Sequence, residues 1–215
     1  MLRYLAPMGL YRQHVVPRLV ELTCGAKGIE RFRHAAMEGL SGRVLEIGFG
    51  SGLNVPHYPD EVTEVFAVEP AATARRIAEE RIAAAAIPVL HVGLDGQAVE
   101  LPDASCDAAL CTFSLCTIPD PGRALSEVTR ILRPGGRLHL LEHGRSPEPG
   151  VARWQQRIDP LERRLADGCH LSRDPVALLE DAGFTLERCD QRYVKGPKPW
   201  SYFTVAVGVG VVRAI

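Results

Sequence analysis

Three glycines at alternating positions follow a short apolar run, and this stretch is the part of the sequence best suited to binding a ligand. The run covers residues 43–47, and Gly48, Gly50 and Gly52 come directly after it. Glycines permit the tight turns and the close backbone approach that a bound cofactor requires. A dinucleotide-binding fingerprint has the spacing GxGxxG, whereas this chain has GxGxG with an acid, Glu46, two positions before the first glycine. The pattern predicts a cofactor-binding turn after a buried strand.

A second acidic residue ends the next predicted strand, which covers residues 62–69. Glu69 follows Gly52 by seventeen residues, and an acid at this point can accept hydrogen bonds from the two hydroxyls of a ribose. Both NAD and S-adenosylmethionine carry such a ribose. Glu69 therefore predicts a nucleoside-containing cofactor without distinguishing between the two.

The remaining elements must hold these residues at one edge of a sheet. Apolar runs of strand length alternate with segments of helical periodicity, which predicts an α/β fold with a doubly wound, mostly parallel sheet. The first forty residues look helical, with one apolar face formed by Val15, Val16, Leu19, Val20 and Leu22, and Gly25 and Gly28 are expected to break the run. Pro17 is expected in a first turn or a kink. The expected strands cover residues 43–47, 62–69, 89–92, 108–112, 137–142, 184–192 and 202–211, and the expected later helices residues 70–86, 121–132 and 175–182.

Composition limits the kind of protein this is. The chain has 215 residues, of which 46% are hydrophobic, and a formal net charge of −1, which predicts a single domain and gives no electrostatic reason to expect a nucleic-acid partner. Six cysteines without a CxxC pair predict reduced thiols in the cytoplasm and no metal site. The longest apolar run, residues 205–212, is far shorter than the ~20 residues of a membrane helix, so a soluble monomer or homodimer is expected.

Three separately spaced segments resemble class I S-adenosylmethionine-dependent methyltransferases with a type 11 methyltransferase domain. They are the glycine stretch, the acid Asp95 twelve residues before Asp107, and residues 127–136, which read EVTRILRPGG. The resemblance implies a Rossmann-like sheet of seven strands with an antiparallel last strand, and S-adenosylmethionine as the methyl donor. The resemblance also implies that Asp95 holds the adenine amino group, a feature that a dehydrogenase does not need.

The resemblance extends to the cofactor residues. It implies contacts with S-adenosylmethionine from the N-terminal lid, the glycine turn, the ends of the first four strands and the turn after the third. These residues are Tyr11, Glu46, Gly48, Phe49, Gly50, Ser51, Gly52, Asn54, Glu69, Pro70, Asp95, Gly96, Thr112 and Phe113. For Tyr11, packing on a helix surface remains the alternative.

Downstream segments narrow the resemblance to the methyltransferase-like thiol S-methyltransferases. Glu142-His143, Trp154-Gln155-Gln156 and residues 167–173, DGCHLSR, are similar to that family. Mammalian members carry an N-terminal hydrophobic anchor, which is not evident in this chain, so a small soluble thiol or hydrosulfide is the expected acceptor. Residues 1–42 are expected to form a helical lid, and residues 147–171 a helical cap over the acceptor.

A thiol acceptor suggests which residues do the chemistry. A free thiol has a pKa of ~8.5, so a nearby imidazole would increase the thiolate fraction at neutral pH. His143 and His170 are the candidate catalytic residues, with Ser114, Cys116, Trp154 and Cys169 expected to contact the substrate. Two alternatives remain: methylation of a quinone, phospholipid amine or arsenical, and a regulatory module that binds the cofactor without turnover.

Overall fold

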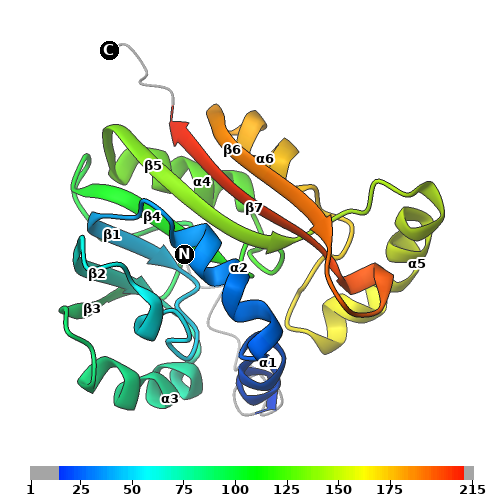
Figure 1. The fold of residues 1–215 in the computed structure, drawn as a ribbon, viewed down its shortest axis with the longest axis horizontal. Coiled ribbons are helices and arrows are strands. Elements are labelled where there is room, and N and C mark those ends of the chain that lie inside the picture. Colours follow the sequence, from blue (N-terminus) through cyan, green and yellow to red (C-terminus); the bar gives the residue numbers. More distant parts are fainter. Residues whose placement is uncertain (1–14, 211–215) are drawn as a thin grey trace.

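The structure, a computed structural model, describes residues 15–210 of the chain, and Tyr11 lies outside them. One mixed sheet organises the molecule (Figure 1), with strand order β3-β2-β1-β4-β5-β7-β6. Strand β7 runs antiparallel to both of its neighbours, and the other pairs are parallel. The strands are β1 Gly42–Ile47, β2 Val62–Val68, β3 Val89–Gly93, β4 Cys106–Thr112, β5 Leu132–His143, β6 Phe184–Tyr193 and β7 Tyr202–Gly210. The predicted Rossmann-like sheet of seven strands with an antiparallel last strand is confirmed.

Helices cover both faces of this sheet because its central strands carry apolar side chains on both sides. Leu45 packs with the core beneath α4 and α6, whereas its neighbour Val44 packs with the core beneath α2 and α3, as the alternation of a strand requires. The helices are α1 Val16–Cys24, α2 Lys27–Met37, α3 Ala72–Ala83, α4 Pro121–Ile131, α5 Pro149–Leu165 and α6 Pro175–Asp181, with short 3-10 turns η2 Val55–His57 and η3 Lys198–Trp200.

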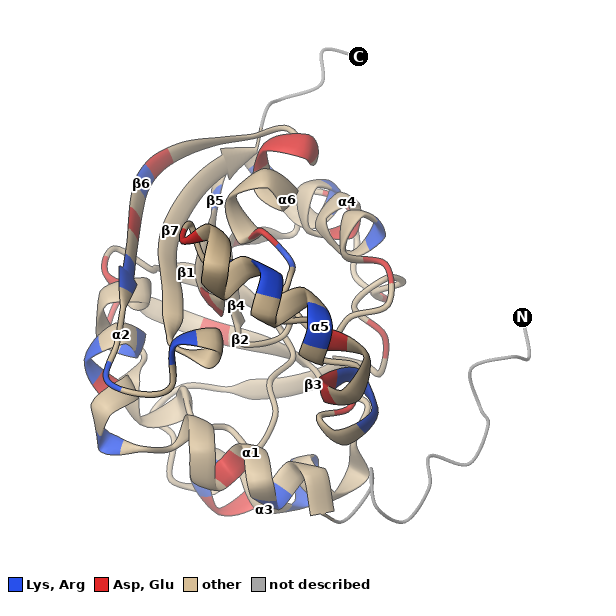
Figure 2. Ribbon diagram, turned by 90° about the vertical axis from the view of Figure 1, so that its right-hand side faces the viewer, with Lys and Arg blue, Asp and Glu red and all other residues tan. Residues whose placement is uncertain are grey.

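The strand order reverses between β1 and β4, and this reversal fixes the place of the site. Strand β1 pairs with β2 on one side and with β4 on the other, so the connections leave in opposite directions and open a crevice at the carboxyl ends of the strands. Figure 2 looks onto this edge of the sheet, where α5 and α1 both lie. Within residues 15–210, no helix combines the length and the apolarity that crossing a membrane requires.

Three local expectations need correction. Strand β5 begins at Leu132 and not at Arg137. Residues 133–136, expected to connect the preceding helix to this strand, therefore belong to the strand. Gly28 lies inside α2 instead of breaking it, since a helical glycine costs only ~1 kcal/mol and tertiary packing overrides this. On α1 only Val16 and Pro17 are buried, while Leu19 and Leu22 are exposed, because this helix covers a cavity and not an apolar core.

One buried amide joins helix α5 to two neighbouring segments of the chain. Gln155 is fully buried, and its Nε2 donates to the carbonyl oxygens of Gly144 and Pro199 at 3.0 and 2.9 Å while its Oε1 accepts from the amide of Ser146 at 2.8 Å. These three bonds join the helix to the chain leaving β5 and to the turn before β7. The amide therefore positions α5 beside the crevice.

Candidate active site

A cavity of about 1170 Å³ occupies the crevice at the carboxyl ends of β1, β2 and β4. Its walls come from α1, the glycine turn, the loops after β2, β3 and β4, and the end of α5 with the loop that follows. The volume exceeds the ~300–1,000 Å³ of ordinary small-molecule sites. The cavity therefore has room for a nucleoside cofactor and a second small molecule.

The glycine turn requires its glycines for two different reasons. Gly48, Gly50 and Gly52 have φ angles of 72, 59 and 76°, in the left-handed region. A Cβ on Gly48 would lie 1.9 Å from Ser114 Oγ, whereas one on Gly50 would meet nothing closer than the Gly48 oxygen at 3.9 Å. Gly48 thus permits close packing of the loop after β4, and Gly50 leaves space on the cavity side for a ligand.

Two carboxylates face the cavity from the neighbouring loops. Glu69 is buried, and its two oxygens accept hydrogen bonds from the amides of Gly50 and Ala71 at 2.8 and 2.7 Å, while burial raises its pKa. Asp95 accepts two bonds from Gln97 through Oδ1, and no bond to Oδ2 occurs among residues 15–210. These positions fit a ribose and an adenine amino group, so the residues present fit S-adenosylmethionine.

A buried polar network supports the turn from behind. Glu46 is fully buried and accepts from Asn54 Nδ2 at 2.7 Å and from the Tyr58 hydroxyl. Asn54 in turn accepts from the buried guanidinium of Arg33 at 2.6 Å and donates to Thr112 at 3.0 Å. Burial raises the pKa of Glu46 to about 7, although Tyr58, Asn54 and Arg33 act in the opposite direction. The network connects α2 to β1 and β4 directly below the cavity.

Helix α1 is held over the glycine turn by a cluster of ionic contacts. Glu21 pairs with Arg81 of α3 at 2.5 Å and accepts from the Ser51 hydroxyl, and Arg81 also donates to the Ser51 carbonyl at 2.7 Å. Val16, Pro17 and Val20 of the same helix line the cavity. Helix α1 therefore forms one wall of the cavity beside the glycine turn.

The loop after β4 leaves the sheet in a strained conformation at the cavity wall. Phe113 has a φ of 53°, which is uncommon for a residue with a bulky side chain. Its amide donates to the Leu141 carbonyl at 2.8 Å, and its ring packs edge-on against Phe203. Such strain persists only where the surroundings hold it, and it concentrates at functional sites.

An imidazole and a carboxylate form a pair at the far end of the cavity. His170 lines the cavity, and its Nδ1 lies 3.2 Å from Asp159 Oδ2 on α5. Asp159 is held by the amide and hydroxyl of Ser172, both 3.0 Å from its Oδ1. Burial and the nearby Arg173 guanidinium lower the pKa of His170. The lowered pKa favours the neutral imidazole, which can accept a proton.

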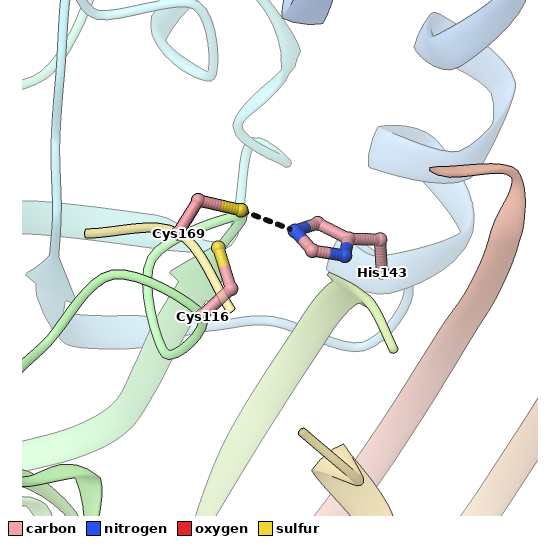
Figure 3. Close-up of side chains that lie close together, drawn as sticks. All are labelled: Cys116, His143 and Cys169. Atoms are coloured by element: carbon pink, nitrogen blue, oxygen red, sulfur yellow. Dashed lines mark hydrogen bonds between the residues drawn. The ribbon is translucent and has the colours of Figure 1, made fainter. Parts of the chain in front are cut away.

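A second histidine lies beside two thiols behind the wall of the cavity. Three side chains point toward one another here (Figure 3): Cys116 from the loop after β4, His143 at the end of β5, and Cys169 just before His170. His143 Nε2 is 3.2 Å from Cys169 Sγ. None of the three lines the cavity. His170 joins this cluster to the cavity, because its amide donates to the Cys116 carbonyl at 2.8 Å.

The pKa values of Cys169 and His143 in this cluster are shifted in opposite directions. The hydrogen bond from Cys116 and the contact with His143 lower the pKa of Cys169 to about 5, against the effect of burial. Burial lowers the pKa of His143, but Cys169 and Glu142 outweigh it and raise the pKa to about 9. Both shifts favour a Cys169 thiolate beside a His143 imidazolium.

The structure brings most of the predicted cofactor residues to the cavity. Those lining it are Gly48, Phe49, Gly50, Ser51, Asn54, Glu69, Pro70, Asp95, Gly96, Thr112 and Phe113. Glu46 lies in the network behind the turn, and Gly52 faces α3, where a Cβ would be 3.3 Å from that of Ala78.

Only some of the residues predicted to contact the acceptor line the cavity. Ser114 and His170 line the cavity, whereas His143, Cys116 and Cys169 are placed behind its wall. Trp154 lies on the outer face of α5 and is 59% exposed, because the buried face of that helix is the one carrying Ala152, Gln155 and Asp159. The cavity therefore contains one of the two predicted catalytic histidines.

Some residues of the site have no local signal in the sequence. Arg33 reads as the wet face of a helix but is 4% exposed and donates to Asn54. The pairing of Asp159 with His170 and the meeting of Cys116, His143 and Cys169 depend on contacts between distant segments. Only the three-dimensional arrangement could identify them.

Comparison with known proteins agrees with this geometry. Residues 45–140 match the family model described as a methyltransferase domain. Among solved structures, a SAM-dependent methyltransferase of Thermotoga maritima, titled a possible histamine N-methyltransferase, superimposes with a TM-score of 0.65 at 23% identity, covering 92% of this chain and 98% of that one. This likeness concerns the fold.

Two curated relatives are closer in sequence. A phosphatidylethanolamine N-methyltransferase of Cereibacter sphaeroides is 33% identical over 61% of this chain and 65% of its own length. Human thiol S-methyltransferase TMT1A is also 33% identical, over 75% of this chain and 68% of its own length. The chain therefore belongs to the class I S-adenosylmethionine-dependent methyltransferases, in the family that includes the thiol S-methyltransferases TMT1.

Proposed function

We propose that this methyltransferase transfers the methyl group of S-adenosylmethionine to the sulfur of a small thiol or of hydrosulfide. The observation that carries the proposal is the cavity itself, in which cofactor-type groups lie at one end and the His170–Asp159 pair at the other. The relationship to thiol S-methyltransferases supports the same acceptor class. Six free cysteines are consistent with work in a reducing cytoplasm.

The end of the cavity beside the glycine turn binds and orients S-adenosylmethionine. In this proposal Glu69 binds the ribose, Asp95 binds the adenine, and the backbone of the Gly48–Gly52 turn binds the amino-acid part. When bound, S-adenosylmethionine supplies an electrophilic methyl group on a sulfonium. Methyl transfer is an in-line displacement, so holding the acceptor sulfur close and aligned provides most of the acceleration.

The opposite end of the cavity, which contains His170, deprotonates the acceptor thiol. A thiol with a pKa of ~8.5 is a few per cent ionised at neutral pH, and His170 can accept its proton at Nε2 while Asp159 holds Nδ1. His143, predicted for the same role, stands behind the wall beside Cys169. The end of α5, through Pro160 and Arg163, covers this part of the cavity and limits the access of water, as the proposed cap should.

The decisive experiment measures S-adenosylhomocysteine formation by the purified chain with a panel of acceptors. The panel contains small thiols, hydrosulfide, phenols, a hydroquinone, phosphatidylethanolamine vesicles and arsenite, with Gly50→Val as the inactive control. We expect turnover with thiols or hydrosulfide. Turnover confined to a phenol, an amine or arsenite would overturn the acceptor, and cofactor binding without turnover of any acceptor would indicate a binding module.

A further inference from the structure

Two sulfurs and one imidazole nitrogen lie close together behind the cavity wall. They come from the loop after β4, the end of β5 and the loop after α5. Cys116 and Cys169 are 3% and 8% exposed, and the two Sγ atoms and one ring nitrogen of His143 all lie within 4.8 Å of one another. Figure 3 shows the three side chains directed at a common point. They come from three segments separated by more than twenty residues each, so local chain geometry does not force them together.

The spacing is close to that of a metal site. With Zn–S and Zn–N bonds of ~2.3 and ~2.0 Å, the ligand atoms of a tetrahedral ion lie roughly 3.5 to 3.8 Å apart. Shifts of about 1 Å, within the reach of small side-chain rotations, would place all three atoms on one ion. Two thiolates with an imidazole favour a thiophilic ion such as Zn²⁺ over Mg²⁺ or Ca²⁺, which prefer oxygen.

Hydrogen bonding within the protein does not account for the burial of this histidine. His143 Nδ1 is buried and has no hydrogen-bond partner among residues 15–210, while its other nitrogen faces Cys169. The carboxylate of Glu142 is fully buried beside the ring, with Oε1 4.0 Å from His143 Nε2. An ion on the two sulfurs and Nε2 would compensate the negative charge that Cys169 and Glu142 bring to this buried place.

We propose that Cys116, His143 and Cys169 form a Cys₂His site that binds one Zn²⁺ ion. As the ion binds, the Cys116 thiol and the His143 Nε2 each release a proton to solvent, so that two thiolates and a neutral imidazole face the ion. Three protein ligands leave a fourth position open, and Thr117, Gly168 and His170, which are next to the ligands in the chain, line the cavity. The ion would thus fasten the loop carrying His170 to the ends of β4 and β5.

The test measures metal binding by the full chain, independently of methyl transfer. The protein is reduced with a phosphine, freed of metal with a chelator and titrated with Co²⁺. We expect one equivalent to produce thiolate-to-cobalt charge-transfer absorption and the visible bands of a tetrahedral ion, and one equivalent of Zn²⁺ to abolish both. Absence of stoichiometric binding by either ion would overturn the site.

Substitutions then assign the ligands. Cys116→Ser, Cys169→Ser and His143→Gln should each weaken Zn²⁺ binding at least 100-fold, whereas Cys189→Ser, on the exposed part of β6, should bind as the parent does. Binding retained by all three ligand variants would refute the assignment. Cofactor binding measured by calorimetry reports whether each variant is folded.

Alkylation of the parent protein tests the site even if a ligand variant fails to fold. Zn²⁺ should protect Cys116 and Cys169 from N-ethylmaleimide at least tenfold, as read by mass spectrometry, and should leave Cys189 reactive. Equal labelling with and without Zn²⁺ would contradict the proposal. Protection by arsenite but not by Zn²⁺ would also overturn it, because it would assign the thiols to a trivalent arsenical.

Discussion

The two ends of the cavity are built in different ways. At the cofactor end, each contact group lies at the end of its own strand, as Gly50 follows β1 and Glu69 follows β2, and backbone conformation does much of the work. At the acceptor end, His170 depends on Asp159 of α5, and α5 depends on Gln155. The first end is local in sequence and the second is assembled from distant segments.

This difference separates binding from acceptor chemistry. Changes at the cofactor end should abolish cofactor binding without disturbing the cap. Changes at the acceptor end should reduce turnover while the cofactor still binds. Each of the following variants tests that separation.

The largest effect is expected from Gly50→Val. Its φ of 59° disfavours a β-branched residue, and the new side chain would project toward the cavity. Calorimetry should show S-adenosylhomocysteine binding weakened more than 100-fold. Gly28→Ala, on an exposed helical surface with nothing within 4 Å of the added Cβ, is the matched control and should bind normally.

Next comes His170→Ala, for which kcat/KM with a thiol should fall 10- to 100-fold while cofactor affinity stays within twofold. The rise of kcat/KM with pH should also move to higher pH, because the base is lost and only ionisation of the acceptor thiol, with a pKa of ~8.5, remains. Asp159→Asn should give a smaller loss in the same direction. An unchanged pH profile in a folded His170→Ala protein would remove His170 as the base.

Gln155→Ala should affect the cap and the acceptor more than the cofactor. Three buried hydrogen bonds disappear, and two carbonyls and one amide lose their partner, which should lower the free energy of unfolding by about 2 kcal/mol. Urea unfolding measures this loss, and KM for the acceptor should rise. Gln156→Ala, on the exposed side of the same helix, should change neither quantity.

The smallest effect concerns pH and stability. Burial raises the pKa of Glu46 to about 7, whereas an unfolded glutamate titrates near ~4.3. Between these values the folded chain holds the extra proton, so the stability contributed by Glu46 is present below about pH 4 and is lost as the pH rises through 7.

Glu46→Gln, which cannot titrate there, makes this visible. The melting temperature of the parent minus that of Glu46→Gln should decrease by a few degrees from pH 5 to pH 8, in thermal melts at each pH. Glu100→Gln, at an exposed position, should run parallel to the parent. A difference independent of pH would contradict the raised pKa.

The contrast between the two ends also explains what the sequence could reveal. Gly48, Gly50, Glu69 and Asp95 follow predictable strands at fixed spacing, so their convergence follows from the topology of a parallel sheet. The buried role of Arg33 could not be predicted, because a basic residue on an amphipathic helix normally faces solvent. Trp154 was predicted as a wall of the acceptor site, but the rotation of α5, set by distant contacts of Gln155, turns it outward.

The attachment of α5 also bears on how acceptor preference can change over evolutionary time. Its Leu161 and Leu165 are 59% and 50% exposed, and polar contacts of Gln155 and Asp159 hold it. Exposed substitutions usually alter stability by less than ~0.5 kcal/mol, so most of this helix can vary without cost to folding. Arg163 and Arg164 are exposed but also line the cavity, so their substitution should shift the ranking of acceptors at constant melting temperature. Parallel loss of turnover and melting temperature would show that the two properties are linked.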